Sequence, residues 1–214
     1  MSSFNEFLQT MKEQMPKLNT HPLDHALRLP MPPGITLELG VYRGNTITRI
    51  ANAMKHDTIY GFDSFEGLPE SWQRPDMAFD KGAFSLQSRL PPVPKNVELI
   101  KGWFDQTLPA FAKEHEQRQS KIKLLHIDCD IYTSTKRAFD TLGYMFQPDM
   151  IIVFDELLNY PTYEQHEIKA FYEFLQQSKL YTVEWIGKQG EVDLHPQKDN
   201  GYFDQPVACR LKAV

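Results

Sequence analysis

Residues 35–54, ITLELGVYRGNTITRIANAM, constrain the fold more than any other stretch of the chain. Residues 35–39 alternate between apolar and other side chains as a strand does, and the later apolar residues repeat at the spacing of one helix face. Gly40 and Gly44 lie between these two patterns and predict a turn. A buried strand, a glycine turn and a helix are therefore expected, with room for a small ligand on the turn.

The glycine turn has the pattern E-x-G-x-x-x-G, which begins at Glu38 and differs from the G-x-G-x-x-G that binds a dinucleotide pyrophosphate. Glycine lets the backbone approach a ligand, and the first turn of the following helix offers unpaired N–H groups to a carboxylate or phosphate. We therefore expect a nucleoside with an amino acid tail, such as S-adenosylmethionine. Glu38 would hold its ammonium group, and the turn amides would face its carboxylate. The alternative is an ordinary tight turn whose glycines serve packing.

Length and composition limit the chain to a single main domain. It has 214 residues, 41% of them hydrophobic, and we expect an N-terminal helix and lead-in at 1–34 and the domain at 35–214. A net charge of -5 without a long Lys/Arg run argues against nucleic-acid binding. Two cysteines without metal-type spacing indicate a reducing compartment. No apolar run is long enough for a leader or a membrane span, so we expect a soluble, cytoplasmic protein with no membrane partner.

Seven segments have the character of strands: residues 35–39, 58–62 and 97–100, a fourth that runs through 123–127 to the acids Asp128 and Asp130, and residues 150–154, 181–186 and 207–211. Helical patterns lie between the earlier strands, whereas a polar loop without such a pattern joins the last two. The expected fold is α/β, a Rossmann-like, doubly wound and mostly parallel seven-stranded sheet with an antiparallel C-terminal edge hairpin.

Several helices are expected around this sheet. Residues 4–15 predict an N-terminal helix that covers the cofactor pocket, pairs with another subunit in a homo-oligomer, or simply packs on the core. Further helices are expected from about Asp105 and from near Tyr163. A helix after Asp130 has its N-cap candidates in residues 133–135 and Gly143 just past its end.

Residues after the second and third strands are candidates for contacts with the cofactor. Asp63 follows the second strand about 20 residues after the glycine turn, where an acidic residue can accept hydrogen bonds from both ribose hydroxyls. As an alternative, it caps a helix or forms a turn. Trp103 or Phe104, after the third strand, could stack on an adenine or fill the core.

Residues 65–94 form a long segment without a sustained period. Such segments in compact domains are often lids or binding loops. We expect a lid that is mobile without ligands and closes over the acceptor, with Trp72, Phe79 and Phe84 as apolar anchors. The alternative is a fixed surface elaboration with its aromatic residues packed in the core.

Acidic residues end two successive strands. Asp128 and Asp130 follow the fourth strand and share a face if they alternate, while Cys129 points the other way. Asp155 and Glu156 follow the fifth strand. Neighbouring parallel strands would bring these carboxylates within reach of one Mg²⁺ or Mn²⁺. Cys129 is expected in the core, and so is His126 with its hydrogen bonds satisfied. His166 is expected on the surface or, alternatively, as a base that reaches the site.

The chain resembles the macrocin and mycinamicin O-methyltransferase family of class I S-adenosylmethionine-dependent methyltransferases. The resemblance runs from about residue 35 to 211, through LELGVYRGNT, DSFEGLPE, KGWFDQTLP, LLHIDCDIYTST, IIVFDELLNYP and QPVACRL in this order. It implies cofactor contacts by Glu38, Gly40, Val41, Tyr42, Gly44, Thr46, Asp63, Ser64, Phe65, Trp103 and Asp128. It also implies a divalent metal on Asp128, Asp130, Asp155 and Glu156. The family's antibiotic enzymes usually have Asp-Asp-Tyr where this chain has Asp155, Glu156 and Leu157.

The first functional hypothesis is therefore a metal-dependent O-methyltransferase that acts on a hydroxyl of a small molecule such as a sugar, natural product or diol. Asp130 would take the proton of that hydroxyl, and the oxygen would attack the sulfonium methyl in line. A second hypothesis is a glycosyltransferase in which Asp128 and Asp130 form a DxD site for the metal of a nucleotide-sugar. A third is a module of the same fold that binds a partner and has lost catalysis.

Overall fold

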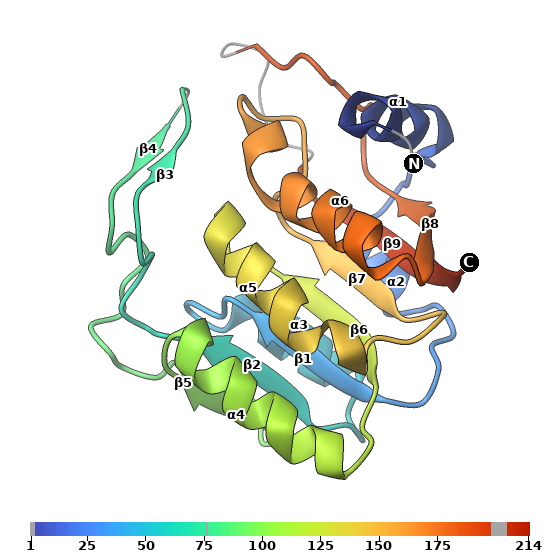
Figure 1. Ribbon diagram of the computed structural model, residues 1–214. Coiled ribbons are helices and arrows are strands. Elements are labelled where there is room, and N and C mark those ends of the chain that lie inside the picture. Colours follow the sequence, from blue (N-terminus) through green and yellow to red (C-terminus); the bar gives the residue numbers. More distant parts are fainter. Residues whose placement is uncertain (1–2, 76, 198–204) are drawn as a thin grey trace.

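The computed structural model describes residues 3–75, 77–197 and 205–214, and within them a seven-stranded sheet forms the centre of the molecule (Figure 1). Its strand order is β5-β2-β1-β6-β7-β9-β8. The strands are β1 Ile35–Leu39, β2 Ile59–Asp63, β5 Val97–Lys101, β6 Ile122–Ile127, β7 Ile151–Phe154, β8 Tyr181–Gly187 and β9 Val207–Ala213. The first five pair in parallel, and β9 runs antiparallel to both β7 and β8. The expected fold class is confirmed.

Helices cover both faces of the sheet (Figure 1). On one face lie α4 (Phe104–Gln117), α5 (Tyr132–Leu142) and α6 (Glu167–Ser178), and on the other lie α2 (Pro22–Ala26) and α3 (Asn45–Ala53). Strand β7, IIVF, shows why the central strands are apolar throughout, because both faces of the sheet are buried. Ile152 and Phe154 belong to the hydrophobic cluster on one face, and Ile151 and Val153 belong to the cluster on the other.

The N-terminal helix α1 (Phe4–Gln14) packs on the body of the protein. It starts with a capping box, in which the Ser3 hydroxyl accepts a hydrogen bond from the Glu6 amide and the Glu6 carboxylate accepts one from the Ser3 amide. Phe4 and Phe7 place their rings 5.1 and 5.4 Å from that of Tyr172 in α6. Of the three roles considered for this helix, packing on the core is the one that the structure shows.

Four details differ from the sequence prediction. The lead-in contains the short α2, and the segment predicted to be irregular contains a small hairpin of β3 (Trp72–Gln73) and β4 (Ala78–Phe79). Both elements are too short to show a period. Helix α6 begins at Glu167, after a separate 3₁₀ turn, η2 (Tyr163–Gln165). The predicted cap residues 133–135 are inside α5, whose N-cap is Ile131 without a side-chain hydrogen bond.

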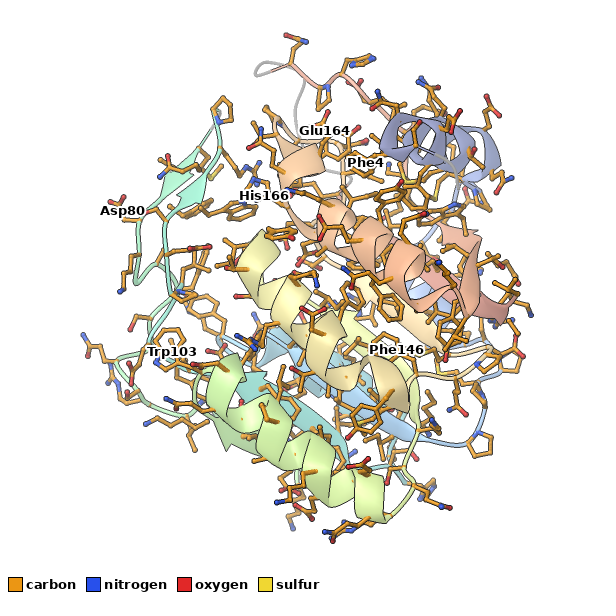
Figure 2. The ribbon with its side chains drawn as sticks, in the orientation of Figure 1. Phe4, Asp80, Trp103, Phe146, Glu164 and His166 are labelled. Carbon is orange, nitrogen blue, oxygen red and sulfur yellow. The ribbon has the colours of Figure 1, made fainter. Side chains whose placement is uncertain are left out.

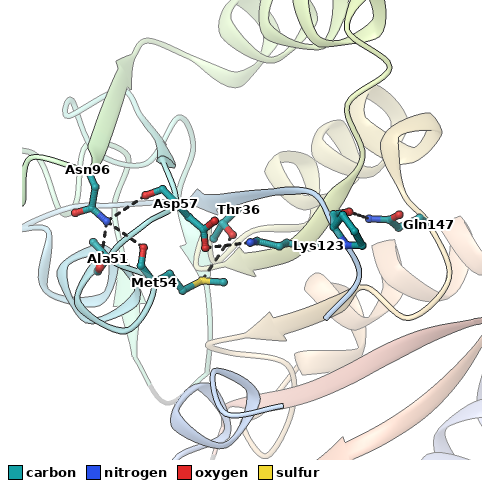
Figure 3. A network of polar contacts seen from close by, with 8 residues as sticks. Thr36, Ala51, Met54, Asp57, Asn96, Lys123 and Gln147 are labelled. Atoms are coloured by element: carbon teal, nitrogen blue, oxygen red, sulfur yellow. Dashed lines mark hydrogen bonds and ion pairs between the residues drawn. The ribbon is translucent and has the colours of Figure 1, made fainter. Parts of the chain in front are cut away.

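A network of polar contacts lies at the amino ends of the parallel strands, opposite their carboxyl ends (Figure 3). The side-chain nitrogen of Asn96 lies 3.1, 3.3 and 3.2 Å from the carbonyl oxygens of Ala51, Met54 and Asp57. Lys123 in β6 donates to the Asp57 carboxylate at 3.0 Å. These bonds join the end of α3 to two strands, so the position of α3 is set from the end that lies away from the glycine turn.

In the described parts of the chain, every helix is too short or too polar to cross a bilayer. The loop between β8 and β9 was predicted to be polar and without a helix, and its residues 198–204 lie outside the described residues.

Candidate active site

A cavity of about 810 Å³ opens at the carboxyl ends of β1, β2, β5, β6 and β7. The predicted site residues that line it are Gly40, Val41, Tyr42, Asp63, Ser64, Trp103, Asp128, Asp130 and Glu156. The other predicted residues are not among those that line it, namely Glu38, Gly44, Thr46, Phe65 and Asp155. Trp103 immediately precedes α4, at the edge of the cavity (Figure 2). Its neighbour Phe104 lines the cavity too, so both candidate adenine-stacking rings are available.

Glycine is needed at the two positions of the turn for different reasons. Gly40 has φ +88°, and a Cβ on it would lie 1.7 Å from the backbone oxygen of Asp128. Only glycine therefore lets the end of β1 pass this close to the end of β6. Gly44 has φ +80° and is the N-cap of α3, and a Cβ there would lie 3.2 Å from Val93. These features of Gly44 fit the backbone turn and its packing, and its contact with the cofactor stays a prediction.

Asp63 holds the glycine turn in place. One carboxylate oxygen accepts hydrogen bonds from the amides of Val41 and Tyr42 at 2.9 and 2.7 Å, and the other accepts from the amide of Phe65 at 2.6 Å. Two of the turn amides that were expected to face the carboxylate of the cofactor thus donate to Asp63. Tyr42 and Phe65 both have positive φ, 46° and 56°, so these bonds hold a backbone that side chains rarely adopt.

Replacing Asp63 with asparagine should weaken binding of S-adenosylhomocysteine by about tenfold or more. The amide nitrogen of asparagine would face an N–H donor, and one lost or unsatisfied hydrogen bond of this kind costs about 1–3 kcal/mol. Calorimetric titration measures the affinity, and circular dichroism checks the fold. Asp105→Asn is the matched control, because Asp105 also lines the cavity but is exposed. Unchanged affinity in a folded Asp63→Asn variant would contradict this role.

Three carboxylates converge at the centre of the cavity wall. Asp128, Asp130 and Glu156 each offer an oxygen atom, and these atoms lie within 4.8 Å of one another. The convergence was expected, but its cause differs from the strand alternation that we assumed. Strand β6 already ends at Ile127, and Asp130 has φ 65°, so a left-handed residue turns the chain back toward Asp128. Cys129 points away, with its sulfur 3.3 Å from the Thr135 hydroxyl.

Burial dominates the electrostatics of this cluster. It raises the pKa of Asp128 and of Glu156 well above the ordinary range, and the neighbouring carboxylates raise both further. It raises the pKa of Asp130 to about 7, with Asp155 adding to the shift and Arg74 opposing it. Within the described residues, Glu156 Oε2 is buried and has no hydrogen-bond partner. Three crowded carboxylates with an orphan oxygen fit a divalent cation.

Asp155 and His126 form a second polar group behind the wall. The Nε2 atom of His126 lies 3.9 Å from Asp155 Oδ1, and its Nδ1 atom lies 3.4 Å from Glu38 Oε1. These contacts are longer than well-formed hydrogen bonds. Burial raises the pKa of Glu38, and His126 works against that shift. His126 is in the core as expected, but its hydrogen bonds are not satisfied there by the described residues, which corrects our prediction.

The β3–β4 hairpin forms the outer wall of the cavity, and sequence reasoning missed its central residue, Arg74. The guanidinium carbon of Arg74 lies 4.7 Å from the ring centre of Trp72 and 4.5 Å from that of Tyr160. The Tyr160 ring is stacked on His166 at 6.0 Å. Figure 2 shows His166 between the hairpin and the body of the protein, where it is half-buried and does not line the cavity. In the sequence, the aromatic residue Trp72 close to Arg74 is the signal that could have indicated this arrangement.

The aromatic residues of the expected lid are packed in this structure. Trp72 is buried and stacks on Phe79 at 5.3 Å, and Phe79 contacts Phe84 at 5.0 Å. Phe79 and Phe84 are half-buried and line the cavity. This arrangement matches the fixed alternative at Trp72. Closure of the outer part of the hairpin on ligand binding stays a prediction.

The chain is similar to a protein family and to several solved structures. A family model described as a methyltransferase domain matches residues 37–157, more than half of the chain. Two solved structures are similar over nearly the whole chain. The calicheamicin methyltransferase CalS11 is 20% identical, with 96% of this chain and 79% of that chain covered and a TM-score of 0.58. The O-methyltransferase NovP is 18% identical, with 98% and 80% covered and a TM-score of 0.57.

An O-methyltransferase from Bacillus cereus, solved in complex with SAH, is 15% identical, with 99% of this chain and 92% of that chain covered and a TM-score of 0.50. At these identities the likeness is one of fold. No curated protein sequence matches the chain.

Proposed function

The chain belongs to the methyltransferase-domain family, and from this premise we propose that it is an S-adenosylmethionine-dependent O-methyltransferase that uses Mg²⁺ or Mn²⁺. Its acceptor is a hydroxyl of a small molecule. The observation that carries the metal-dependent part is the cluster of Asp128, Asp130 and Glu156 in the wall of the cavity that begins at the glycine turn. The fold is shared with CalS11 and NovP, which are named as methyltransferases.

The cofactor fits the end of the cavity formed by the glycine turn. Gly40, Val41 and Tyr42 line this end of the cavity, as do Asp63, which accepts from the amides of Val41 and Tyr42, and Trp103. The cavity of about 810 Å³ exceeds what a nucleoside with an amino acid tail needs, which leaves space for an acceptor beside it. Glu38 would hold the ammonium group from behind the wall, by itself or through water.

Asp128, Asp130 and Glu156 would hold the divalent cation, which supplies a Lewis acid that lowers the pKa of an acceptor hydroxyl. Glu156, rather than Asp155, contributes from the end of β7. Asp130 would take the hydroxyl proton, and the hairpin side chains that line the cavity would help to exclude water. Placing the acceptor oxygen in line with the methyl group accounts for much of the expected rate.

Two alternatives lose support. A DxD glycosyltransferase would use Asp128 and Asp130, but it gives no role to the glycine turn held by Asp63, and the family model is that of a methyltransferase domain. A module without catalysis would not need three carboxylates within 4.8 Å of one another, because such an arrangement is unfavourable unless a cation compensates for it.

Calorimetric titration with S-adenosylhomocysteine, with a nucleotide-sugar as control, tests the proposed cofactor. We expect binding of the first ligand and none of the second. Binding of the nucleotide-sugar alone would favour the glycosyltransferase and contradict the proposal.

Metal binding should depend on pH around neutrality. The pKa of Asp130 is raised to about 7 in the metal-free protein, mainly by burial, so its stabilising proton is present at pH 6 and is lost by pH 8. The metal-free protein should therefore lose thermal stability over this interval. A divalent cation no longer competes with that proton at pH 8, so the rise in Tm on adding Mg²⁺ should be larger at pH 8 than at pH 6.

Melting curves followed by circular dichroism measure both effects, with Asp130→Asn as the control that should weaken the pH dependence of the Mg²⁺ effect. A larger rise in Tm at pH 6 than at pH 8 would contradict the assignment.

A further inference from the structure

His126 lies between two carboxylates that belong to different parts of the proposed site. It is in β6, in register with Glu38 in β1, and its Nδ1 atom is 3.4 Å from Glu38 Oε1. Its Nε2 atom is 3.9 Å from Asp155 Oδ1, at the end of β7. The imidazole ring of β6 therefore faces a residue of β1 on one side and a residue at the end of β7 on the other. On one side it meets the glutamate of the cofactor turn, and on the other it meets an acid beside the metal cluster.

Both His126 and Glu38 are completely buried, with 0% exposure. Their four side-chain polar atoms make no hydrogen bond to any of the described residues. Buried polar groups without partners are costly, so they are rarely kept without a reason. The contacts of 3.4 and 3.9 Å are slightly too long for hydrogen bonds, and small movements would shorten either one.

A neutral imidazole has a single N–H group, which it can donate to Glu38 or to Asp155 but not to both. An ammonium group beside Glu38 would supply that carboxylate with a cationic partner. The N–H group would then be available to Asp155, and a hydrogen bond would hold this carboxylate in place next to the cluster. A side chain of Asp155 that is held in place would in turn favour a divalent cation there.

We propose that His126 is a positioning residue through which cofactor binding and divalent cation binding favour each other. This inference rests on the proposed function, because it takes Glu38 as the partner of the cofactor ammonium and residues Asp128, Asp130 and Glu156 as metal ligands. The coupling is reciprocal, so the effect of Mg²⁺ on affinity for the cofactor measures it completely.

The test is a set of calorimetric titrations with S-adenosylhomocysteine, in excess chelator and in saturating Mg²⁺. In the wild type, Mg²⁺ should increase the affinity about fivefold or more. In His126→Asn, the side-chain amide reaches the position of Nδ1 beside Glu38 but not that of Nε2. The affinity in chelator should thus remain within about twofold of the wild type, whereas the effect of Mg²⁺ should disappear.

His115→Asn is the matched control. His115 is also a buried histidine, but its Nδ1 atom contacts the Ser120 hydroxyl at 3.1 Å, away from the cavity. This variant should keep the wild-type effect of Mg²⁺. If His126→Asn does not fold, Asp155→Asn interrupts the same path at a half-buried position, and it too should lose the effect.

An unchanged Mg²⁺ effect in a folded variant, or a wild type whose affinity for S-adenosylhomocysteine does not respond to Mg²⁺, would overturn the inference. These results differ from failure of the proposed function, in which the wild type would not bind S-adenosylhomocysteine under either condition.

Discussion

Glu156→Gln should reduce metal-dependent methyl transfer on the order of 1,000-fold. Its carboxylate offers an oxygen atom within 4.8 Å of oxygen atoms of Asp128 and Asp130, close enough for the three residues to share a cation, and glutamine keeps the shape while it removes the charge. Lewis-acid stabilisation is worth several kcal/mol, and each 1.36 kcal/mol corresponds to about tenfold in rate. The measurement is the turnover of S-adenosylmethionine at saturating Mg²⁺.

Asp155→Asn is the control for this prediction, because Asp155 follows the same strand but is outside the cluster. It should lose much less activity than Glu156→Gln. Binding of S-adenosylhomocysteine in chelator should be almost unchanged in Glu156→Gln. If the two variants exchanged their effects, Asp155 would be the metal ligand, and the site as built from this structure would be wrong.

Gly40→Ala should destabilise the protein by about 3 kcal/mol or more, with loss of cofactor binding. The residue has φ +88°, and its new Cβ would lie 1.7 Å from the Asp128 carbonyl oxygen, so the ends of β1 and β6 would have to separate. Gly82→Ala is a close control. Gly82 has nearly the same φ, +86°, but a Cβ there meets nothing within 4 Å.

The control should therefore show only the cost of the left-handed backbone, about 1–2 kcal/mol. Urea unfolding measures the free energy of unfolding of both variants. Equal losses in the two would mean that the close approach of β1 to β6 has no importance beyond the backbone conformation.

The sheet could be predicted because its strands are distinct in sequence. Strand β7 is an apolar run without polar interruptions, and the polar connection before β9 lacks a helical period, which correctly indicated an antiparallel edge. The hairpin β3–β4 could not be found in this way. Each strand has two residues, too few for any period, and the hairpin is held by contacts of Trp72 and Arg74 with Tyr160, far along the chain.

The site was predicted at the level of residue types and strand ends, and less well in its contacts. Asp128, Asp130 and Glu156 come together as acids at neighbouring strand ends should. Which of Asp155 and Glu156 joins the carboxylate cluster depends on the direction that each side chain takes after β7. The pairing of His126 with Glu38 depends on the register of β6 and β1. Neither can be read from the sequence of one strand. The bonds of Asp63 to the turn likewise join residues about 20 positions apart.

Metal-dependent methyl transfer to a hydroxyl group is tested by measuring the formation of S-adenosylhomocysteine from S-adenosylmethionine. The assay uses a panel of hydroxylated acceptors, sugars and diols included, and runs each in Mg²⁺ and in excess chelator. We expect product formation that requires an acceptor and Mg²⁺ and that disappears in chelator. Acceptor-dependent product formation at the full rate in excess chelator would contradict this expectation.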